Sequence, residues 1–326
     1  MNASTPNVDT LVEIYRRMTL IKQNDERFRS VIKSGKIVAP YYSPRGQEAI
    51  PAAVSVLLTH EDYICTIYRN VHDMLAKGVP MRELWAEYAG KATGTCKGKG
   101  GPMHITHPAS GMMVTTGIVG SSMPIANGLA LAAQIRGEKR IAVAYFGDGA
   151  ANIGAFHEAL NMAAVWKLPV LFVCQNNGYG EHTRYEIATS AAKISDRAAS
   201  YQIPGVTVNG NDPLAIYAAA QTAIERARAG GGPTLLEACT FRFQGHVFGD
   251  ADAYMQKGEK EAAMKQDPVP MFRAWLLAQG HASETQLAAL EAGIEKEIDA
   301  AVEFALSSPN PGLEELQRDV LAEVSA

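Results

Sequence analysis

The residues with the clearest chemical capacity lie in two short polar motifs, GDG at 147–149 and NN at 176–177. Apolar runs precede both motifs, IAVAYF at 141–146 and VLFVC at 170–174. The carboxylate of Asp148 and the amide oxygen of Asn177 are hard donors of the kind that bind Mg²⁺ or Ca²⁺. If the fold brings the two motifs together, they suit a site for a divalent cation.

The segment between the motifs, which is helical to about Trp166, has the length of a crossover helix. Two strands joined in this way are expected to run parallel in one sheet, so their carboxyl ends open on the same edge. Gly147 and Gly149 would let the backbone approach a ligand closely, and a helix starting near Asn152 would direct its N–H groups at an anion. The sequence therefore predicts a diphosphate site that shares a metal ion.

Two other glycine-rich phosphate motifs do not fit. The dinucleotide fingerprint GxGxxG needs a glycine at position 152, which is Asn152. The segment GTCKGKGG at 94–101 lacks the spacing of a Walker A loop and follows a helix rather than a strand. Both motifs are excluded.

The elements that must position these residues alternate along the chain. Apolar periodicity predicts helices at 8–34, 46–59, 80–90, 191–200, 213–229 and 283–306, and strands at 141–146, 170–174, 206–210 and 234–243. The polar segment 244–270 is predicted to be an irregular loop. The alternation predicts an α/β fold, with a central, mostly parallel sheet and helices on both faces. We expect one domain over 1–326, with helical extensions at about 8–60 and about 270–326.

Composition narrows the class of protein. Hydrophobic residues make up 47% and charged residues 20% of the 326 residues, which is typical of a soluble globular protein. A net charge of -4 gives no reason to expect a nucleic-acid partner. No apolar run approaches the ~20 residues of a membrane span, so no membrane is expected. The four cysteines form no CxxC pair, and the N-terminus lacks a secretory signature, so we predict a cytoplasmic location.

Longer runs carry a resemblance to a known family. GDG, 26 residues and NN together resemble the thiamine diphosphate signature of transketolase-like enzymes. The segments KGKGGPMHI, GIVGSSMPIANGLALA and YFGDGAANIGAFHEALNMAAVWKLPVLFVCQNNGYG resemble the α subunit of 2-oxo acid dehydrogenase E1 components. This family includes pyruvate, branched-chain 2-oxo acid and acetoin dehydrogenases. The resemblance covers nearly the whole chain, from RGQEA near residue 45 to the closing PGLEEL.

The resemblance implies thiamine diphosphate and Mg²⁺ as cofactors. The implied metal ligands are the side chains of Asp148 and Asn177 and the main-chain carbonyl of Tyr179. The residues implied to contact the diphosphate are Tyr68, Arg69, Gly147, Gly149 and Ala150, the last two through their N–H groups. Arg69 would supply a forked, charge-assisted contact to phosphate oxygens.

The resemblance also implies which residues face the reacting part of the cofactor. Gly117 and Val119 would contact the aminopyrimidine, and Val119 would hold the cofactor in its bent form. His246, in the segment FRFQGH, would act as the acid/base or positioning residue, with Arg242 nearby as an anion contact. His104 and His107 have a metal-like spacing but lack an acidic third ligand, so we interpret them as loop residues.

The implied activity is that of an oxidoreductase with a lipoyl disulfide as acceptor. Such an enzyme decarboxylates a 2-oxo acid, or cleaves acetoin, and passes the acyl group to a lipoyl-bearing E2 protein. A 2-oxo acid is slightly favoured as substrate because most of the family uses one. The implied partner is an E1 β subunit in an α2β2 heterotetramer, since a β-subunit glutamate activates the cofactor. Small residues at 124–133 suit α–α′ packing. The alternatives are a transketolase-like half-subunit and a non-catalytic scaffold subunit.

A few positions depart from the family pattern. Many members have histidine at the position of Tyr42, and pyruvate and acetoin types have one at the position of Val71, next to His72. Val247 replaces a kinase-regulated serine, and Met255 an arginine. We expect these changes to lie around the substrate entrance, so they concern the substrate rather than the cofactor.

Overall fold

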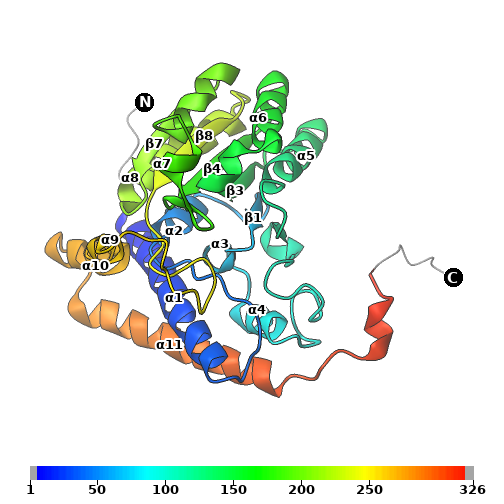
Figure 1. Ribbon diagram of the computed structural model, residues 1–326, viewed down its shortest axis with the longest axis vertical. Coiled ribbons are helices and arrows are strands. Elements are labelled where there is room, and N and C mark those ends of the chain that lie inside the picture. Colours follow the sequence, from blue (N-terminus) through cyan, green and yellow to red (C-terminus); the bar gives the residue numbers. More distant parts are fainter. Residues whose placement is uncertain (1–5, 320–326) are drawn as a thin grey trace.

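A six-stranded parallel sheet forms the centre of the protein (Figure 1), with strand order β2-β1-β3-β4-β8-β7. This computed structural model describes residues 6–319, so the last part of the predicted C-terminal extension lies outside the described residues. The strands are β1 Tyr63–Ile67, β2 Met112–Thr116, β3 Ala142–Gly147, β4 Val170–Asn176, β7 Gly205–Asn209 and β8 Thr234–Cys239. A small antiparallel ribbon joins β5 Tyr179–Gly180 to β6 Thr183–Arg184. The predicted α/β class and parallel sheet are confirmed.

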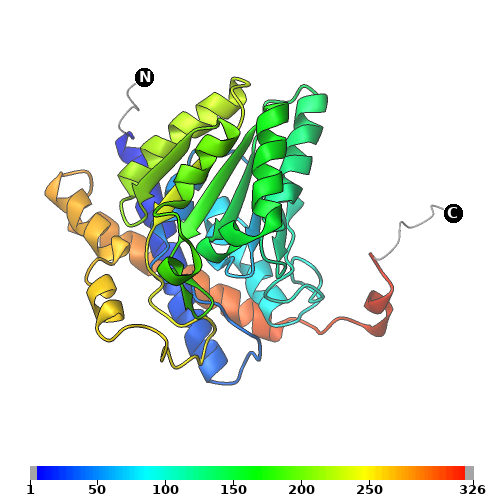
Figure 2. The same cartoon turned by 45° about the horizontal axis from the view of Figure 1, so that its top comes forward.

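Helices cover both faces of the sheet. They are α1 Val8–Lys33, α2 Ala49–Ser55, α3 Val71–Lys77, α4 Met81–Tyr88, α5 Ser122–Ile135, α6 Gly154–Trp166, α7 Tyr185–Ala188, α8 Pro213–Arg228, α9 Glu259–Met264, α10 Pro268–Ala278 and α11 Glu284–Ser307. In the turned view of Figure 2, the green helices α5 and α6 stand side by side next to the sheet. Within residues 6–319, none of these helices combines the length and the apolar character needed to cross a bilayer.

The two faces of the sheet bury different side chains because residues alternate along a strand. In β3, Val143 and Tyr145 belong to the core that contains α1–α4, α8, α10 and α11. Their neighbours Ala144 and Phe146 belong to a second core with α5 and α6. All four residues are fully buried, and burying a large apolar side chain contributes about 1.5–3 kcal/mol. The register of β3 is therefore strongly determined.

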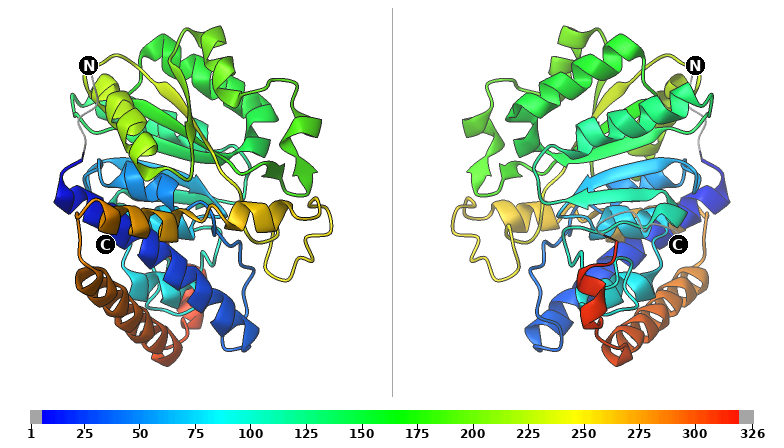
Figure 3. Two further views of the ribbon diagram at one scale, coloured as in Figure 1. Left: turned by 90° about the vertical axis from the view of Figure 1, so that its left-hand side faces the viewer. Right: turned by 90° about the vertical axis from the view of Figure 1, so that its right-hand side faces the viewer.

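The N-terminal and C-terminal helices pack against each other on one side of the sheet. Figure 3 shows α1 (blue) beside α11 (orange to brown) in both views. Tyr15 donates its hydroxyl to Glu291 at 2.6 Å, and Arg27 pairs with Asp299. Ser283 and Gln286 form a capping box at the start of α11. The predicted helices 8–34 and 283–306 are confirmed to within a residue or two.

Several predicted boundaries are wrong. The helix predicted at 46–59 spans only Ala49–Ser55, and that predicted at 191–200 is a 3₁₀ helix at Ile194–Tyr201. The strand predicted at 234–243 ends at Cys239. Just beyond this end, the Thr240 N–H still donates to the Asn176 carbonyl at 2.8 Å, and its hydroxyl donates to the Gly46 carbonyl at 2.7 Å.

The loop predicted at 244–270 contains α9 and the start of α10. The Asp267 side chain caps α10 by accepting the Val269 N–H at 3.1 Å, and Pro268 occupies the first turn. The short elements β1, β2 and α3 were not predicted. β1 has three buried residues in succession and no clear alternation, so its pattern does not separate strand from helix.

Candidate active site

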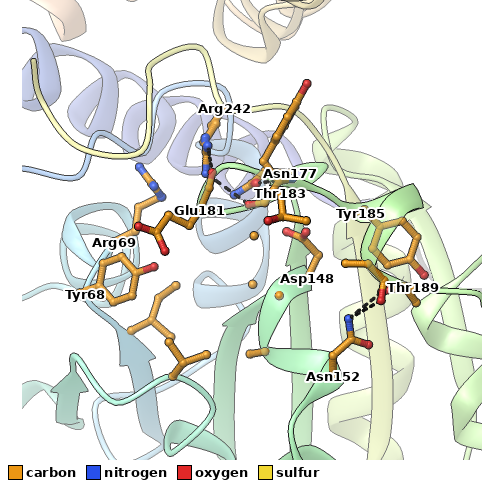
Figure 4. Close-up of a pocket in the computed structure, with 18 residues that line it drawn as sticks. Tyr68, Arg69, Asp148, Asn152, Asn177, Glu181, Thr183, Tyr185, Thr189 and Arg242 are labelled. Carbon is orange, nitrogen blue, oxygen red and sulfur yellow. Dashed lines mark hydrogen bonds between the residues drawn. The ribbon is translucent and has the colours of Figure 1, made fainter. Parts of the chain in front are cut away.

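Asp148 and Asn177 lie at the same edge of the sheet. β3 and β4 pair in parallel, with Gly147 opposite Gln175. Asp148 directly follows β3, and Asn177 directly follows β4. Both residues line a cavity of about 340 Å³, and Figure 4 shows their side chains near its centre. The crossover geometry expected from the sequence is therefore present.

Most of the predicted site residues line this cavity. They are Tyr68, Arg69, Val119, Gly147, Asp148, Gly149, Ala150, Asn177, Tyr179 and Arg242. Gly117 and His246 lie outside the lining set. Gly117 instead packs beside His104, whose ring would come within 3.6 Å of a Cβ at position 117. The ring of His246 lies next to that of Tyr68, which lines the cavity.

The Asp148 carboxylate is buried without full electrostatic compensation. Burial raises the pKa of Asp148 to about 6, although its own N–H, Arg242, the Asn177 N–H and Arg69 act in the opposite direction. Its side chain is only 2% exposed. A buried carboxylate of this kind is stabilised by a cation, so the position suits a metal ion.

Asn177 presents an oxygen beside this carboxylate. Its side-chain nitrogen donates to Gln47 Oε1 at 2.7 Å, and its Oδ1 accepts the Tyr179 N–H at 3.2 Å. An amide oxygen has two lone pairs, so one remains for another partner. The donor set is therefore hard and oxygen-based, which fits Mg²⁺.

The turn after β3 supplies N–H groups to the cavity. A 3₁₀ turn at Asp148–Asn152 contains Gly149 and Ala150, and α6 begins only at Gly154. The helix expected to begin near Asn152 therefore begins at Gly154, after this turn. A Cβ at Gly149 would lie 3.1 Å from the Gly180 Cα, so glycine permits a close approach there. A Cβ added at Gly147 would have no atom within 4 Å, so the space at this position does not require glycine.

Arg69 is a buried cation, and Figure 4 shows it across the cavity from Asn152. It donates to the Ser43 carbonyl at 2.6 Å and to the His246 carbonyl at 3.0 Å. Burial and the charge of Arg242 lower the pKa of Arg69 to about 10, so it remains charged at neutral pH. Arg69 therefore places a positive charge in the cavity and also holds the His246 segment by a hydrogen bond.

His246 sits in an aromatic cluster behind Tyr68. The ring centroids of Tyr42 and Tyr68 lie 5.4 and 5.8 Å from that of His246. Its main-chain N–H donates to Asp250 at 2.7 Å and to the Tyr254 hydroxyl at 3.0 Å. Burial, Arg69 and Arg242 lower the pKa of His246 to about 4. The imidazole is therefore neutral at pH 7, and its unprotonated ring nitrogen can accept a hydrogen bond.

Comparison with known proteins identifies the family of this arrangement. Residues 16–314 match the family described as dehydrogenase E1 component. The chain belongs to the dehydrogenase E1 component family. It is 43% identical to the α subunit of acetoin:2,6-dichlorophenolindophenol oxidoreductase from Bacillus subtilis, over 94% of this chain and 92% of that protein. It is 40% identical to the subunit of the same name from Cupriavidus necator, over 96% and 94%. It is 36% identical to the pyruvate dehydrogenase E1 component α subunit from Porphyra purpurea, over 96% and 93%.

As a dehydrogenase E1 component, the chain is an oxidoreductase subunit, and the predicted resemblance to E1 α subunits is confirmed. Use of thiamine diphosphate is general in this family. The cavity combines two strand ends, a buried carboxylate and a glycine turn. These groups have the chemistry that would hold a diphosphate and a metal ion.

One wall of this E1 site consists of residues that the sequence motifs did not indicate. The additional polar residues that line the cavity are Asn152, Glu181, Thr183, Tyr185 and Thr189. Asn152 donates to the Thr189 hydroxyl at 2.8 Å, which joins the turn after β3 to the segment after α7. Glu181 has a φ of 52°, an uncommon conformation for a residue other than glycine. Its position only two residues after Tyr179 is the signal that could have identified it.

The departures from the family pattern separate into two groups. Tyr42 lies beside the site, with its ring centroid 4.6 Å from that of Tyr68, which lines the cavity. Val71 and His72 are buried in α3, with 1% and 0% exposure. The prediction that all the departures surround a substrate entrance is therefore wrong for these two residues. Packing of α3 against α1 and α2 decides their place.

Proposed function

We propose that this chain is the α subunit of a dehydrogenase E1 component that binds Mg²⁺ and thiamine diphosphate in the cavity at the β3–β4 edge. The observation that carries this proposal is the placement of Asp148 and Asn177 at the ends of two paired parallel strands, on one cavity. Hard oxygen donors beside a glycine turn are the components of a metal–diphosphate site.

Each group of the cofactor has candidate partners. Asp148, Asn177 and the Tyr179 carbonyl would hold the metal. The N–H groups of Gly149 and Ala150, with Gly147 at the turn, would contact the diphosphate from one side.

Tyr68 and Arg69 would contact the diphosphate from the other side. Gly117 and Val119 would contact the aminopyrimidine. Val119 is 47% exposed, so it is available for such contact.

The catalytic roles follow from charge and position. When bound, thiamine diphosphate supplies a nucleophilic carbon for cleavage of the bond next to a carbonyl group. His246 would act as the acid/base or positioning residue, and its lowered pKa of about 4 keeps the ring neutral at pH 7 before any proton is transferred. Arg242 would stabilise negative charge beside it. The main-chain N–H of His246 is held by Asp250 and Tyr254, which fixes the segment that carries the ring.

For the substrate, we infer acetoin before a 2-oxo acid. This reverses the slight preference from sequence alone. Two relatives named for acetoin are 43% and 40% identical to this chain, whereas the pyruvate-named relative from Porphyra purpurea is 36% identical. The acyl acceptor would be a lipoyl group on an E2 partner.

The chain would function in an α2β2 heterotetramer with an E1 β subunit, in the cytoplasm. A family α subunit implies a β partner and an E2 protein in general. Apolar side chains on the outer sides of α5 and α6 suit a subunit contact, because single exposed apolar residues are common but a group of them is not. They include Ile125, Ile135, Met162, Val165 and Trp166.

The test is reconstitution with the β subunit. The complex should reduce 2,6-dichlorophenolindophenol with acetoin, and should require both Mg²⁺ and thiamine diphosphate. A 2-oxo acid panel run in parallel would decide the substrate. Transfer of ketol groups between sugar phosphates would support the transketolase-like alternative. A complex without saturable binding of Mg²⁺ and thiamine diphosphate would be a scaffold, and the proposal would then be wrong.

A further inference from the structure

A continuous set of buried polar side chains extends from Asn177 into the core. Asn177 is 6% exposed, and Gln47, His72, Asp73 and Gln175 are at most 1% exposed. They come from the end of β4, the loop before α2, and α3. Asn177 donates to Gln47 Oε1 at 2.7 Å, and Gln47 donates to Gln175 Oε1 at 3.3 Å. Gln175 donates to Asp73 Oδ1 at 2.8 Å.

At the core end of this chain of hydrogen bonds, the donor and acceptor atoms of Gln175 can be assigned. The nitrogen of Gln175 faces Asp73 Oδ1, which accepts from it whether the acid is ionised or carries its proton on Oδ2, so the oxygen of Gln175 faces the other way. That oxygen lies 2.8 Å from His72 Nε2, which requires a proton on Nε2 and assigns the His72 tautomer. It also accepts from the nitrogen of Gln47. Thr66 donates to the second oxygen of Asp73, which anchors the carboxyl group.

At the end near the cavity, the amide atoms of Asn177 and Gln47 can be assigned in the same way. The Tyr179 main-chain N–H is a donor 3.2 Å from Asn177 Oδ1, so the atom of Asn177 that faces it must be oxygen. The nitrogen of Asn177 then faces Gln47, whose oxygen accepts it. If Gln47 were reversed, two amide nitrogens would meet in a buried position with no acceptor between them. The two fixed ends therefore agree on one orientation of each amide.

We propose that Gln47 and Gln175 are positioning residues, which hold the Asn177 side chain with its amide oxygen toward the metal ion. An amide oxygen binds Mg²⁺ and an amide nitrogen does not, so the orientation of Asn177 decides whether it is a ligand. Partners that orient a metal ligand typically account for about 10–100-fold in metal affinity. The inference rests on the proposed function, because it assigns Asn177 to the metal.

The test measures Mg²⁺ affinity in the αβ complex, by calorimetric titration of MgCl2 at a fixed excess of thiamine diphosphate. Gln47→Met keeps the length of the side chain but removes the acceptor, and we expect a loss of about 10–100-fold. Gln47→Glu keeps an oxygen opposite the Asn177 nitrogen, so its affinity should equal or exceed that of the wild type. A loss in Gln47→Glu as large as that in Gln47→Met would overturn the proposal, as would unchanged affinity in Gln47→Met.

A second background separates orientation from general packing. Asn177→Asp presents a carboxylate oxygen in either orientation, so it does not need Gln47 to direct it. Adding Gln47→Met to Asn177→Asp should change Mg²⁺ affinity by less than about threefold, because the effect of Gln47 is coupled to the amide at position 177 and is lost when that amide is replaced. An equal loss in both backgrounds would show that Gln47 acts through packing and would overturn the inference. Absence of saturable Mg²⁺ binding in the wild-type complex would instead disprove the proposed function.

Discussion

Arg242 donates from its guanidinium to the main-chain carbonyl oxygen of Tyr179 at 3.2 Å. The same side chain donates to the Tyr254 hydroxyl at 2.8 Å, and that hydroxyl accepts the His246 N–H. Arg242 therefore connects the segment after β4 with the segment that carries His246. The connection depends on the forked shape of guanidinium, because one side chain must reach two groups at once.

We expect Arg242→Lys to fail as a replacement. Lysine keeps the positive charge but cannot donate to the Tyr179 carbonyl and the Tyr254 hydroxyl together, so Mg²⁺ affinity should fall about 10–100-fold. The measurement is a Mg²⁺ titration of the αβ complex with thiamine diphosphate present. Arg226→Lys on α8 is the matched control and should behave as wild type. Wild-type affinity in Arg242→Lys would mean that charge alone matters at this position.

Asp148→Asn should abolish most metal-dependent cofactor binding. The change removes the buried carboxylate that the metal would neutralise, so the affinity for Mg²⁺ should fall by more than about 100-fold, beyond the effect of outer partners. Equilibrium titration with thiamine diphosphate and MgCl2 measures this loss. The exposed Asp196 offers a control, and Asp196→Asn should leave the titration unchanged. Comparable weakening in both variants would disagree with a specific role for Asp148.

His246→Ala should separate turnover from binding. The imidazole lies outside the cavity lining but beside Tyr68, so its loss should leave Mg²⁺ and thiamine diphosphate affinity within about threefold. Loss of a proton-transfer group lowers kcat by about 10²–10⁴-fold. Dye reduction by the reconstituted complex provides kcat, and titration provides the affinity. His182 lies 5.9 Å from the His246 ring, and His182→Ala serves as the control with a smaller effect. Equal losses of binding and kcat in His246→Ala would contradict this assignment.

Asp73 should make the stability of the chain depend on pH. Burial raises the pKa of Asp73 to about 8, although hydrogen bonds from Thr66 and Gln175 act in the opposite direction. Between the unfolded pKa near 4 and about 8, the folded state holds a proton that the unfolded state has lost. The free energy of unfolding should therefore fall as pH rises through this window, by at most about 1.4 kcal/mol per pH unit.

The variant Asp73→Asn resembles the protonated acid and should not show this dependence. Urea unfolding of the purified wild-type and variant chains at pH 5, 6, 7 and 8 would measure the difference between them. We expect the variant to gain stability relative to the wild type as pH rises. A difference that stays constant across the series would show that Asp73 is not protonated in the folded chain.

The sequence by itself determined the sheet edge at which the site forms. GDG and NN follow two apolar runs joined by a helix of crossover length, and such units place their strand ends together. Asp148 and Asn177 could therefore be predicted to meet. The long helices at both ends of the chain could also be predicted, because their apolar period continues over many turns. The short buried strands β1 and β2 have too few residues to show a period.

Tertiary structure alone decided which atoms face the cavity. The orientation of the Asn177 amide depends on Gln47, which is 130 residues away in sequence. Likewise, His246 is held by Asp250 and by Arg69, and the 177-residue separation of Arg69 from His246 leaves no local pattern. Side-chain direction in a buried site is set by packing and hydrogen bonds between distant segments, and a linear motif records residue types but not these contacts.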